Sequence, residues 1–345
     1  MPVSTSSQLS RDRLIWMYTQ MCRIREFEER VKRTFVEHPG VIRGHAHLGD
    51  GAEASIVGCL ATRQENDLVM PSYRCHGYPL VLGTPARALM SEIYQRKDGV
   101  CKGFGGSMHL ADPTHHFPTA SGIIGQGIAH AAGAAYAAQV KKTGQVVYSF
   151  FGDGSSKQGV FFETLNMAAV WKLPVVFVLE NNGYQAYTKA ELEDANAKAG
   201  EPLAMKAKAF SIPGVTVDGT DPLKVYDVMT VAVERARAGE GPSLIESKFY
   251  RMSPHGNAIT VPPVPTQFQE HEAVEVYGNK AEYEAAKNND PIKKFRAHLI
   301  SGGFFADPDA KKIEDTVRAE MEDVVKFALA SPLPSGSDAL NYVWA

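Results

Sequence analysis

Two short polar motifs follow directly after two apolar runs near the middle of the chain. Gly152-Asp153-Gly154 follows residues 146–151, and Asn181-Asn182 comes just after residues 175–179. If both runs are parallel strands of one sheet, their carboxyl ends meet at the same edge, and Asp153 and Asn182 can share one ligand. Carboxylate and amide oxygens are donors that Mg²⁺ or Ca²⁺ prefers, and Mg²⁺ commonly completes its coordination with phosphate oxygens. The motifs therefore predict a divalent cation next to a diphosphate.

The residues around these motifs add features that suit an anion. Gly154 allows the main chain to approach closely, and a helix that begins near Ser155 and Ser156 would offer unpaired N–H groups to a phosphate. Upstream, Tyr73-Arg74 supplies a phenol donor and a permanent cation that can bind phosphate through two hydrogen bonds. The alternatives are a structural turn with an Asx-capped strand end for the central motifs, and a surface salt bridge for Arg74.

The elements that must position these residues follow from apolar periodicity. Residues 11–35 repeat apolar side chains at intervals of three and four, which predicts an amphipathic helix. The runs at 146–151 and 175–179 flank a helical pattern at 157–171, which predicts a βαβ unit with buried parallel strands. The same reasoning predicts helices at 52–61, 85–95, 121–138 (packed in the interior) and 223–237, a C-terminal helical region at 291–329, and strands at 67–70, 215–217 and 243–249.

Three further segments carry weaker or irregular patterns. Residues 99–106 are rich in glycine and are predicted to form a loop. Residues 189–208 fit a surface helix and a mobile loop equally well. Residues 254–265 contain four prolines and are predicted to be a loop, because proline interrupts both helices and sheets. The alternation of strands and helices predicts one compact α/β domain.

The composition excludes several classes of function. With 44% hydrophobic and 22% charged residues, the chain is predicted to be an ordinary soluble globular protein. A net charge of −3 gives no basic excess, so neither nucleic acid nor an anionic membrane is an expected partner. The four cysteines form no CxxC pair, which favours a reducing compartment. Residues 1–13 lack the apolar core of a signal peptide, and we expect a cytoplasmic location.

Together the two central motifs resemble the fingerprint of thiamine-diphosphate enzymes. The resemblance extends over nearly the whole chain to the alpha subunits of heterotetrameric 2-oxo acid and acetoin dehydrogenases. Four segments carry it: Gly105-Gly106-Ser107-Met108-His109, Gly122-Ile123-Ile124-Gly125, Trp171-Lys172-Leu173-Pro174 and Glu180-Asn181-Asn182-Gly183-Tyr184. It implies a thiamine-diphosphate-binding fold, a parallel sheet flanked by helices, with a helical extension at 1–40, a diphosphate-binding domain at 41–290 and a helical region at 291–345.

The resemblance also implies roles for individual residues. Asp153, Asn182 and the main-chain oxygen of Tyr184 are expected to hold Mg²⁺. His47, in the segment 47–54, matches a histidine of the family's active-site channel, and His255 matches another by its distance from Tyr250-Arg251. Histidine suits both places because it can donate to phosphate or move a proton near neutral pH. The full set of expected cofactor-binding residues is Tyr73, Arg74, Gly122, Ile124, Gly152, Asp153, Gly154, Ser155, Asn182, Tyr184 and His255, with Gly122 and Ile124 meeting the aminopyrimidine through their backbone.

The expected function is the alpha half of an α₂β₂ enzyme. The resemblance implies that a beta subunit supplies the glutamate that activates thiamine diphosphate, and that a small 2-oxo acid or acyloin substrate passes its acyl group to a lipoyl acyltransferase. The alternatives are a non-oxidative thiamine-diphosphate enzyme, transketolase-like or acyloin-forming, and a non-catalytic binding protein. The sequence does not choose among pyruvate, branched-chain 2-oxo acids and acetoin.

Two departures from the family pattern bear on regulation and substrate. Gly256 follows His255 where mammalian relatives carry a regulatory serine, which excludes phosphorylation at that position. The segment 189–208 is longer than in typical relatives, and it brings Glu191, Glu193 and Asp194 near the expected cofactor entrance.

Overall fold

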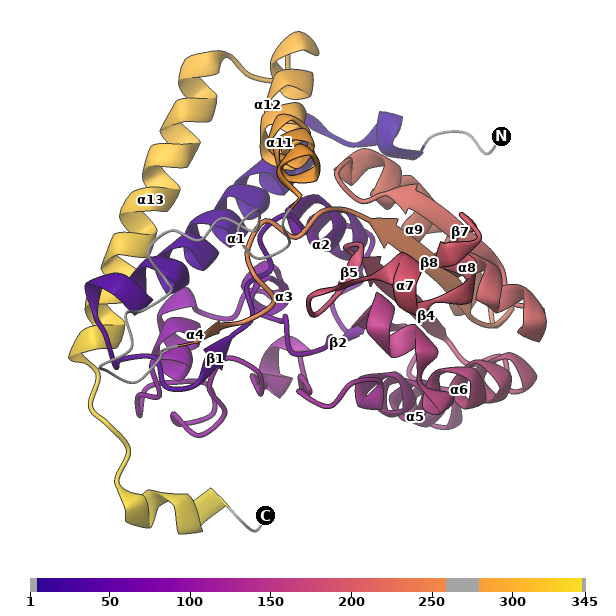
Figure 1. The fold of residues 1–345 in the computed structure, drawn as a ribbon, viewed down its shortest axis with the longest axis horizontal. Helices are drawn as coiled ribbons and strands as arrows, with labels where there is room; N and C mark the ends of the chain where they lie inside the picture. The colour runs from indigo at the N-terminus through magenta and orange to yellow at the C-terminus, as the bar shows by residue number, and fades with distance from the viewer. Residues whose placement is uncertain (1–4, 259–278, 343–345) are drawn as a thin grey trace.

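The computed structural model describes residues 5–258 and 279–342, and a five-stranded parallel sheet lies at its centre (Figure 1). The strands β3 and β4 are buried along almost their whole length, which explains their continuous apolar sequences. The order across the sheet is β2 (Leu68–Met70), β3 (Val147–Gly152), β4 (Val175–Asn181), β8 (Ser243–Lys248) and β7 (Gly214–Asp218).

Helices cover both faces of the sheet and divide the core into two layers. On β3, Tyr148 and Phe150 face one layer, whereas Val147 and Phe151 face the other, as the two-residue period of a strand requires. The second layer is closed by α5 (Gln126–Lys141) and α6 (Gly159–Val170). The first layer is closed by α2 (Glu53–Leu60), α3 (Gly77–Leu82) and α9 (Pro222–Arg237), and its hydrophobic cluster continues into α1 (Arg11–Glu37) and α4 (Ala86–Ile93).

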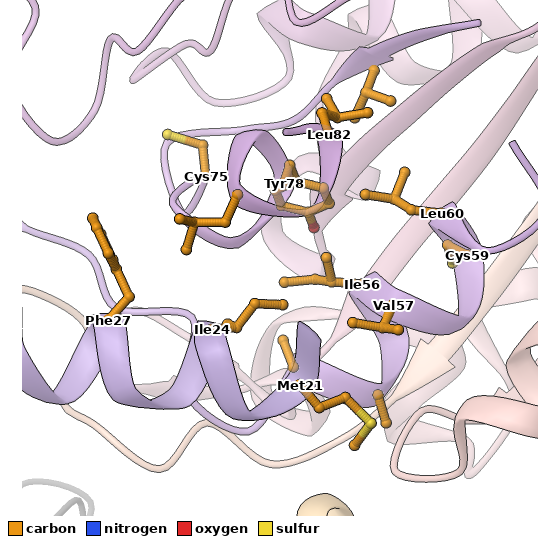
Figure 2. Close-up of a cluster of buried hydrophobic side chains, with 14 of the residues drawn as sticks. Met21, Ile24, Phe27, Ile56, Val57, Cys59, Leu60, Cys75, Tyr78 and Leu82 are labelled. Atoms are coloured by element: carbon orange, nitrogen blue, oxygen red, sulfur yellow. The ribbon is translucent and has the colours of Figure 1, made fainter. Parts of the chain in front are cut away.

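The N-terminal helix α1 packs directly into this core. Its first turn is capped by Ser10, whose hydroxyl accepts a hydrogen bond from the main-chain N–H of Arg13. Figure 2 shows how its buried face meets the neighbouring helices: Met21, Ile24 and Phe27 of α1 lie near Ile56, Val57, Cys59 and Leu60 of the α2 segment and near Cys75, Tyr78 and Leu82 around α3.

The C-terminal helical region packs against the N-terminal helix α1. The long helix α13 (Asp307–Ala330) packs against α1 and α4, and it is preceded by α11 (Lys280–Asn288) and α12 (Pro291–Ser301) (Figure 1). The hydroxyl of Tyr18 donates to Glu314 at 2.5 Å, and Arg23 pairs with Glu320 at 2.8 Å. The division of the chain into residues 1–40, 41–290 and 291–345 stays a prediction.

Short elements connect these helices and strands. The small sheets are β1 (His45–Ala46) with β9 (Asn257–Ala258), and β5 (Tyr184–Gln185) with β6 (Thr188–Lys189). The remaining elements are α7 (Ala190–Glu193), α8 (Ala195–Lys198) and the 3₁₀ turns η1 (Thr5–Gln8), η2 (Pro113–His115), η3 (Asp153–Lys157), η4 (Leu203–Phe210) and η5 (Gly336–Tyr342). Within the described ranges, no helix is both long and apolar enough to cross a membrane.

Most predicted elements are confirmed, and three need correction. The helix predicted at 121–138 begins only at Gln126, because Gly125 has a left-handed φ of +83°. Its prediction as an interior helix was wrong, since Tyr136 and Val140 are exposed. Residues 189–208 form neither one helix nor an irregular loop but the short pieces α7, α8 and η4. The loop predicted at 254–265 includes β9, and its residues 259–265 lie outside the described ranges.

Candidate active site

A cavity of about 210 Å³ lies at the carboxyl ends of β3 and β4. Of the expected catalytic and cofactor-binding residues, it brings together all except His47 and Gly122. Those that line it are Tyr73, Arg74, Ile124, Gly152, Asp153, Gly154, Ser155, Asn182, Tyr184 and His255. The lining also includes Ser72, Glu180, Gln185, Ala186, Phe249 and Arg251, which were not among the expected site residues; Glu180 and Arg251 had entered only as parts of motifs. The two motifs therefore meet at one edge of the sheet, as predicted.

The turn after β3 presents a buried carboxylate to this cavity. Asp153 is only 5% exposed, and burial raises the pKa of its carboxyl above the usual value, against the opposing effect of the Arg251 guanidinium. The helix N-terminus predicted near Ser155 is instead the 3₁₀ turn η3, and α6 begins only at Gly159. The hydroxyl of Ser156 donates to the main-chain oxygen of Asp153 at 2.7 Å and stabilises this turn.

Asn181, the last residue of β4, and Asn182 form two successive Asx turns. The side-chain oxygen of Asn181 accepts from the N–H of Gly183 at 3.0 Å, and that of Asn182 accepts from the N–H of Tyr184 at 3.1 Å. The amide of Asn181 also donates to Glu246 at 2.7 Å, whereas Asn182 lines the cavity. The sequence left an Asx turn as the alternative to metal binding at Asn182. The two roles are compatible, because an amide oxygen that accepts one hydrogen bond has a second lone pair.

Two arginines place buried cations in the same cavity. Arg74 is buried and donates to the main-chain oxygens of Leu48 and, at 3.1 Å, of His255, so a surface salt bridge is the wrong interpretation of this residue. Arg251 is 3% exposed and donates to the main-chain oxygen of Ala186 at 2.8 Å. Burial, together with repulsion from Arg74, lowers the pKa of Arg251 to about 9. A polyanionic ligand would offset this concentration of positive charge.

The pairing of β1 with β9 brings the two predicted histidines together. The ring centroids of His47 and His255 are 5.0 Å apart, and His47 contacts the ring of Tyr73 at 4.6 Å. Burial, reinforced by Arg74, lowers the pKa of His47 to about 2 and that of His255 to about 4. Within the described residues the Nδ1 atoms of both rings are buried without a hydrogen-bond partner. The two rings are therefore neutral at physiological pH, and their unpaired Nδ1 atoms can contact a ligand.

Acidification is expected to destabilise the cofactor-free protein through these rings. The unfolded chain binds the two protons near the ordinary histidine pKa of 6.5, whereas the folded pKa values are about 2 and 4, so stability is lost as the pH falls below 6.5. Between about pH 7 and pH 5, the Tm measured by differential scanning fluorimetry should fall less steeply for His47→Gln than for the wild type. The exposed His130, changed to glutamine, is the control. Equal slopes for His47→Gln and wild type would contradict this assignment.

The loop before α5 lies at the mouth of the cavity. Ile124 lines the cavity while 44% exposed, and the neighbouring Ile123 is 64% exposed. Gly122 lies against His109, since an added Cβ would be 3.2 Å from the ring carbon Cε1. Gly122 is therefore beside the cavity rather than in its wall, and its predicted contact with the aminopyrimidine stays a prediction.

Two acidic residues of 189–208 pair with lysines that contact the turn after β3. Glu193 pairs with Lys157 at 2.7 Å, and Asp194 pairs with the half-buried Lys206 at 2.5 Å. The ammonium of Lys206 also donates to the main-chain oxygen of Ser156 at 3.1 Å. This segment therefore contacts and stabilises the turn on which Asp153 lies.

Comparison with known proteins places this cavity in a family. The family model described as "Dehydrogenase E1 component" matches residues 19–336, which include every residue that lines the cavity. The chain belongs to the dehydrogenase E1 component family. The resemblance to alpha subunits of 2-oxo acid and acetoin dehydrogenases is thereby confirmed, as is the class of thiamine-diphosphate-dependent oxidoreductases acting on oxo groups.

Curated relatives cover nearly the full length of the chain. The alpha subunit of acetoin:2,6-dichlorophenolindophenol oxidoreductase from Bacillus subtilis (strain 168) is 40% identical over 97% of this chain and 95% of its own length. The subunit of the same name from Cupriavidus necator is 38% identical, over 99% of this chain and 97% of its own length. The pyruvate dehydrogenase E1 component subunit alpha of Porphyra purpurea is 34% identical, over 100% and 97% respectively.

Proposed function

We propose that this chain is the alpha subunit of an α₂β₂ dehydrogenase that binds thiamine diphosphate and Mg²⁺ and acts on a 2-oxo acid or an acyloin such as acetoin. The acyl group would pass to a lipoyl group of an acyltransferase, and the enzyme would work in the cytoplasm. The observation that carries the proposal is the single cavity in which Asp153 and Asn182 face two buried arginines. The relatives named for acetoin and for pyruvate support this substrate class.

The residues present fit a Mg²⁺–diphosphate pair. A metal site here would use the carboxylate of Asp153, the amide oxygen of Asn182 and the main-chain oxygen of Tyr184, which are hard donors of the kind Mg²⁺ prefers. Such a site needs no cluster of acidic or histidine side chains, and none of three or more occurs in the described part of the chain. Arg74 and Arg251 would hold the diphosphate, together with Tyr73, Ser155 and the main chain at Gly152 and Gly154.

The remaining residues would orient the substrate. The cofactor, when bound, supplies a carbon that adds to a carbonyl and a ring that accepts the electrons released by C–C cleavage. His47 and His255 are neutral without cofactor, so each ring could form a hydrogen bond to the substrate through its unpaired Nδ1 atom. Arg74, which donates to the main-chain oxygen of His255, would couple the position of that ring to the bound phosphate.

A beta subunit would cover the open side of the cavity. Ile123 and Ile124 are exposed at its mouth, and α5, α6 and the residue that follows α6 carry further exposed apolar side chains. These are Tyr136, Val140, Phe162, Met167, Val170 and Trp171. Apolar surfaces of this kind commonly mark a contact with another protein. In this proposal the partner also supplies the glutamate that activates the cofactor.

The test is to assay the purified chain with and without its co-expressed partner. We expect the chain alone to reduce an artificial electron acceptor no faster than the background, and the complex to turn over one of acetoin, pyruvate or a branched-chain 2-oxo acid. Turnover by the chain alone would contradict the divided site. Product without acceptor reduction would favour the non-oxidative alternative, and a complex that shows no cofactor binding by calorimetry would favour the non-catalytic one.

A further inference from the structure

Three buried polar side chains form a continuous network beside the cavity. The Nδ1 atom of His76 lies 2.8 Å from Glu28 on α1, and its Nε2 atom lies 2.8 Å from the hydroxyl of Ser107. His76 is fully buried, Glu28 is 1% exposed and Ser107 is 6% exposed. Each group therefore depends on the others for its hydrogen bonds, because water does not reach this part of the core.

Both ends of the network hold the main chain that carries His47. The carboxylate of Glu28 accepts from the N–H of Gly49 at 2.8 Å, and the hydroxyl oxygen of Ser107 accepts from the N–H of His47 at 3.4 Å. The residue between them, Leu48, accepts from the guanidinium of Arg74 through its main-chain oxygen. One short segment, residues 47–49, thus connects the network to a histidine beside the cavity and an arginine that lines it.

A single arrangement of protons satisfies these contacts with a neutral imidazole. A carboxylate only accepts, so Nδ1 of His76 must carry the proton that is donated to Glu28. The other ring nitrogen is then an acceptor, and the Ser107 hydroxyl donates to it. This leaves the lone pairs of Ser107 for the N–H of His47, so the direction of every hydrogen bond in the network is fixed.

The order Ser107–His76–Glu28 is also that of a hydrolytic triad, but the surroundings oppose a nucleophilic role. Burial keeps the hydroxyl of Ser107 from a substrate, and its oxygen already accepts from His47. We propose instead that Glu28, His76 and Ser107 are positioning residues that fix residues 47–49 and so hold His47 and Arg74 in place. The inference rests on the proposed function for its effect on turnover.

The test is Ser107→Ala, in the chain co-purified with its partner. We expect kcat to fall about tenfold, because a small displacement of a group at the reacting centre is enough for such a loss. The KM for thiamine diphosphate should change much less, since Arg74 keeps its contact with His255 and Glu28 still holds Gly49. In the cofactor-free chain, hydrogen–deuterium exchange of the peptide 45–50 should become faster. Ser107→Thr, which keeps the hydroxyl, should restore both properties.

The matched control is Ser55→Ala. Ser55 is a buried serine outside the network, and alanine removes the hydrogen bond between its hydroxyl and that of Ser247 at 2.7 Å. Both alanine variants should lower Tm by similar amounts, while only Ser107→Ala changes kcat and the exchange of 45–50. Unchanged exchange and kcat in Ser107→Ala, or an equal loss of kcat in Ser55→Ala, would overturn the inference. The wild-type complex, assayed in parallel, tests the proposed function separately, and the exchange measurement does not depend on it.

Discussion

Asp153→Asn should raise the KM for thiamine diphosphate and Mg²⁺ at least about 100-fold, the upper end of what the loss of a supporting group around a metal costs. The substitution keeps the shape of the side chain but removes its charge, and an amide is a weaker ligand for Mg²⁺ than a carboxylate. In the absence of cofactor, the substitution should not destabilise the folded protein. Burial raises the pKa of Asp153, which means that the folded protein disfavours its charged form, so the variant should be at least as stable as the wild type.

Scanning fluorimetry with and without the cofactor separates these two effects. The Tm without ligand should be equal to or above that of the wild type, and the increase in Tm that Mg²⁺ and thiamine diphosphate produce should disappear. Glu193→Gln is the matched control, because it removes a negative charge that pairs with Lys157 of the same turn but lies outside the cavity. A wild-type KM in Asp153→Asn would refute the metal site.

Arg251→Met has the second largest expected effect, a rise in the KM for thiamine diphosphate of roughly 10- to 100-fold. Charge-assisted hydrogen bonds contribute about 1.5–3 kcal/mol each, which corresponds to that range. The side chain is 3% exposed, and burial and Arg74 lower its pKa, as expected for a cation placed to meet an anion. Steady-state kinetics of the complex at varied cofactor concentration give the KM.

The control for this substitution is Arg235→Met. Arg235 lies on α9 and pairs with Glu240 at 2.9 Å at the surface, so its loss should leave the KM unchanged. Because methionine also removes the hydrogen bond to Ala186, the Tm without cofactor is measured for both variants. An unchanged KM in a folded Arg251→Met variant would exclude this arginine from the diphosphate site.

The sheet and the central motifs could be predicted because burial leaves a clear pattern in the sequence. The strands β3 and β4 are covered on both faces, so their sequences are apolar without alternation, and the polar residues that follow must lie at the sheet edge. Parallel pairing then brings Gly152 of β3 opposite Glu180 of β4. That register alone places Asp153 near Asn182.

Arg251 could not be found in the same way. It belongs to the cavity because β8, the last strand of the sheet in the sequence, pairs with β4, with Lys248 opposite Asn181. Strand order depends on contacts between segments distant in sequence, and no local pattern encodes them. The one local signal for Arg251 is that it closely follows the predicted strand 243–249, but that signal does not say beside which other strand ends it lies.

The structure of residues 189–208 and the start of α5 could not be predicted, for two different reasons. The first segment is held by ion pairs such as Asp194–Lys206, which periodicity does not reveal. The second depends on the left-handed conformation of Gly125, and a glycine in a run of small residues is equally compatible with a helix.

The packing of α13 along α1 has a consequence for how the chain is made (Figure 1). Arg23 pairs with Glu320, so part of the first long helix meets its neighbour only after 320 − 23 = 297 further residues have been translated. At about 5–20 residues per second, the interval is roughly 15 to 60 s. During that time the face of α1 that α13 later covers stays exposed on the nascent chain. Exposed apolar surfaces of this kind are bound by molecular chaperones.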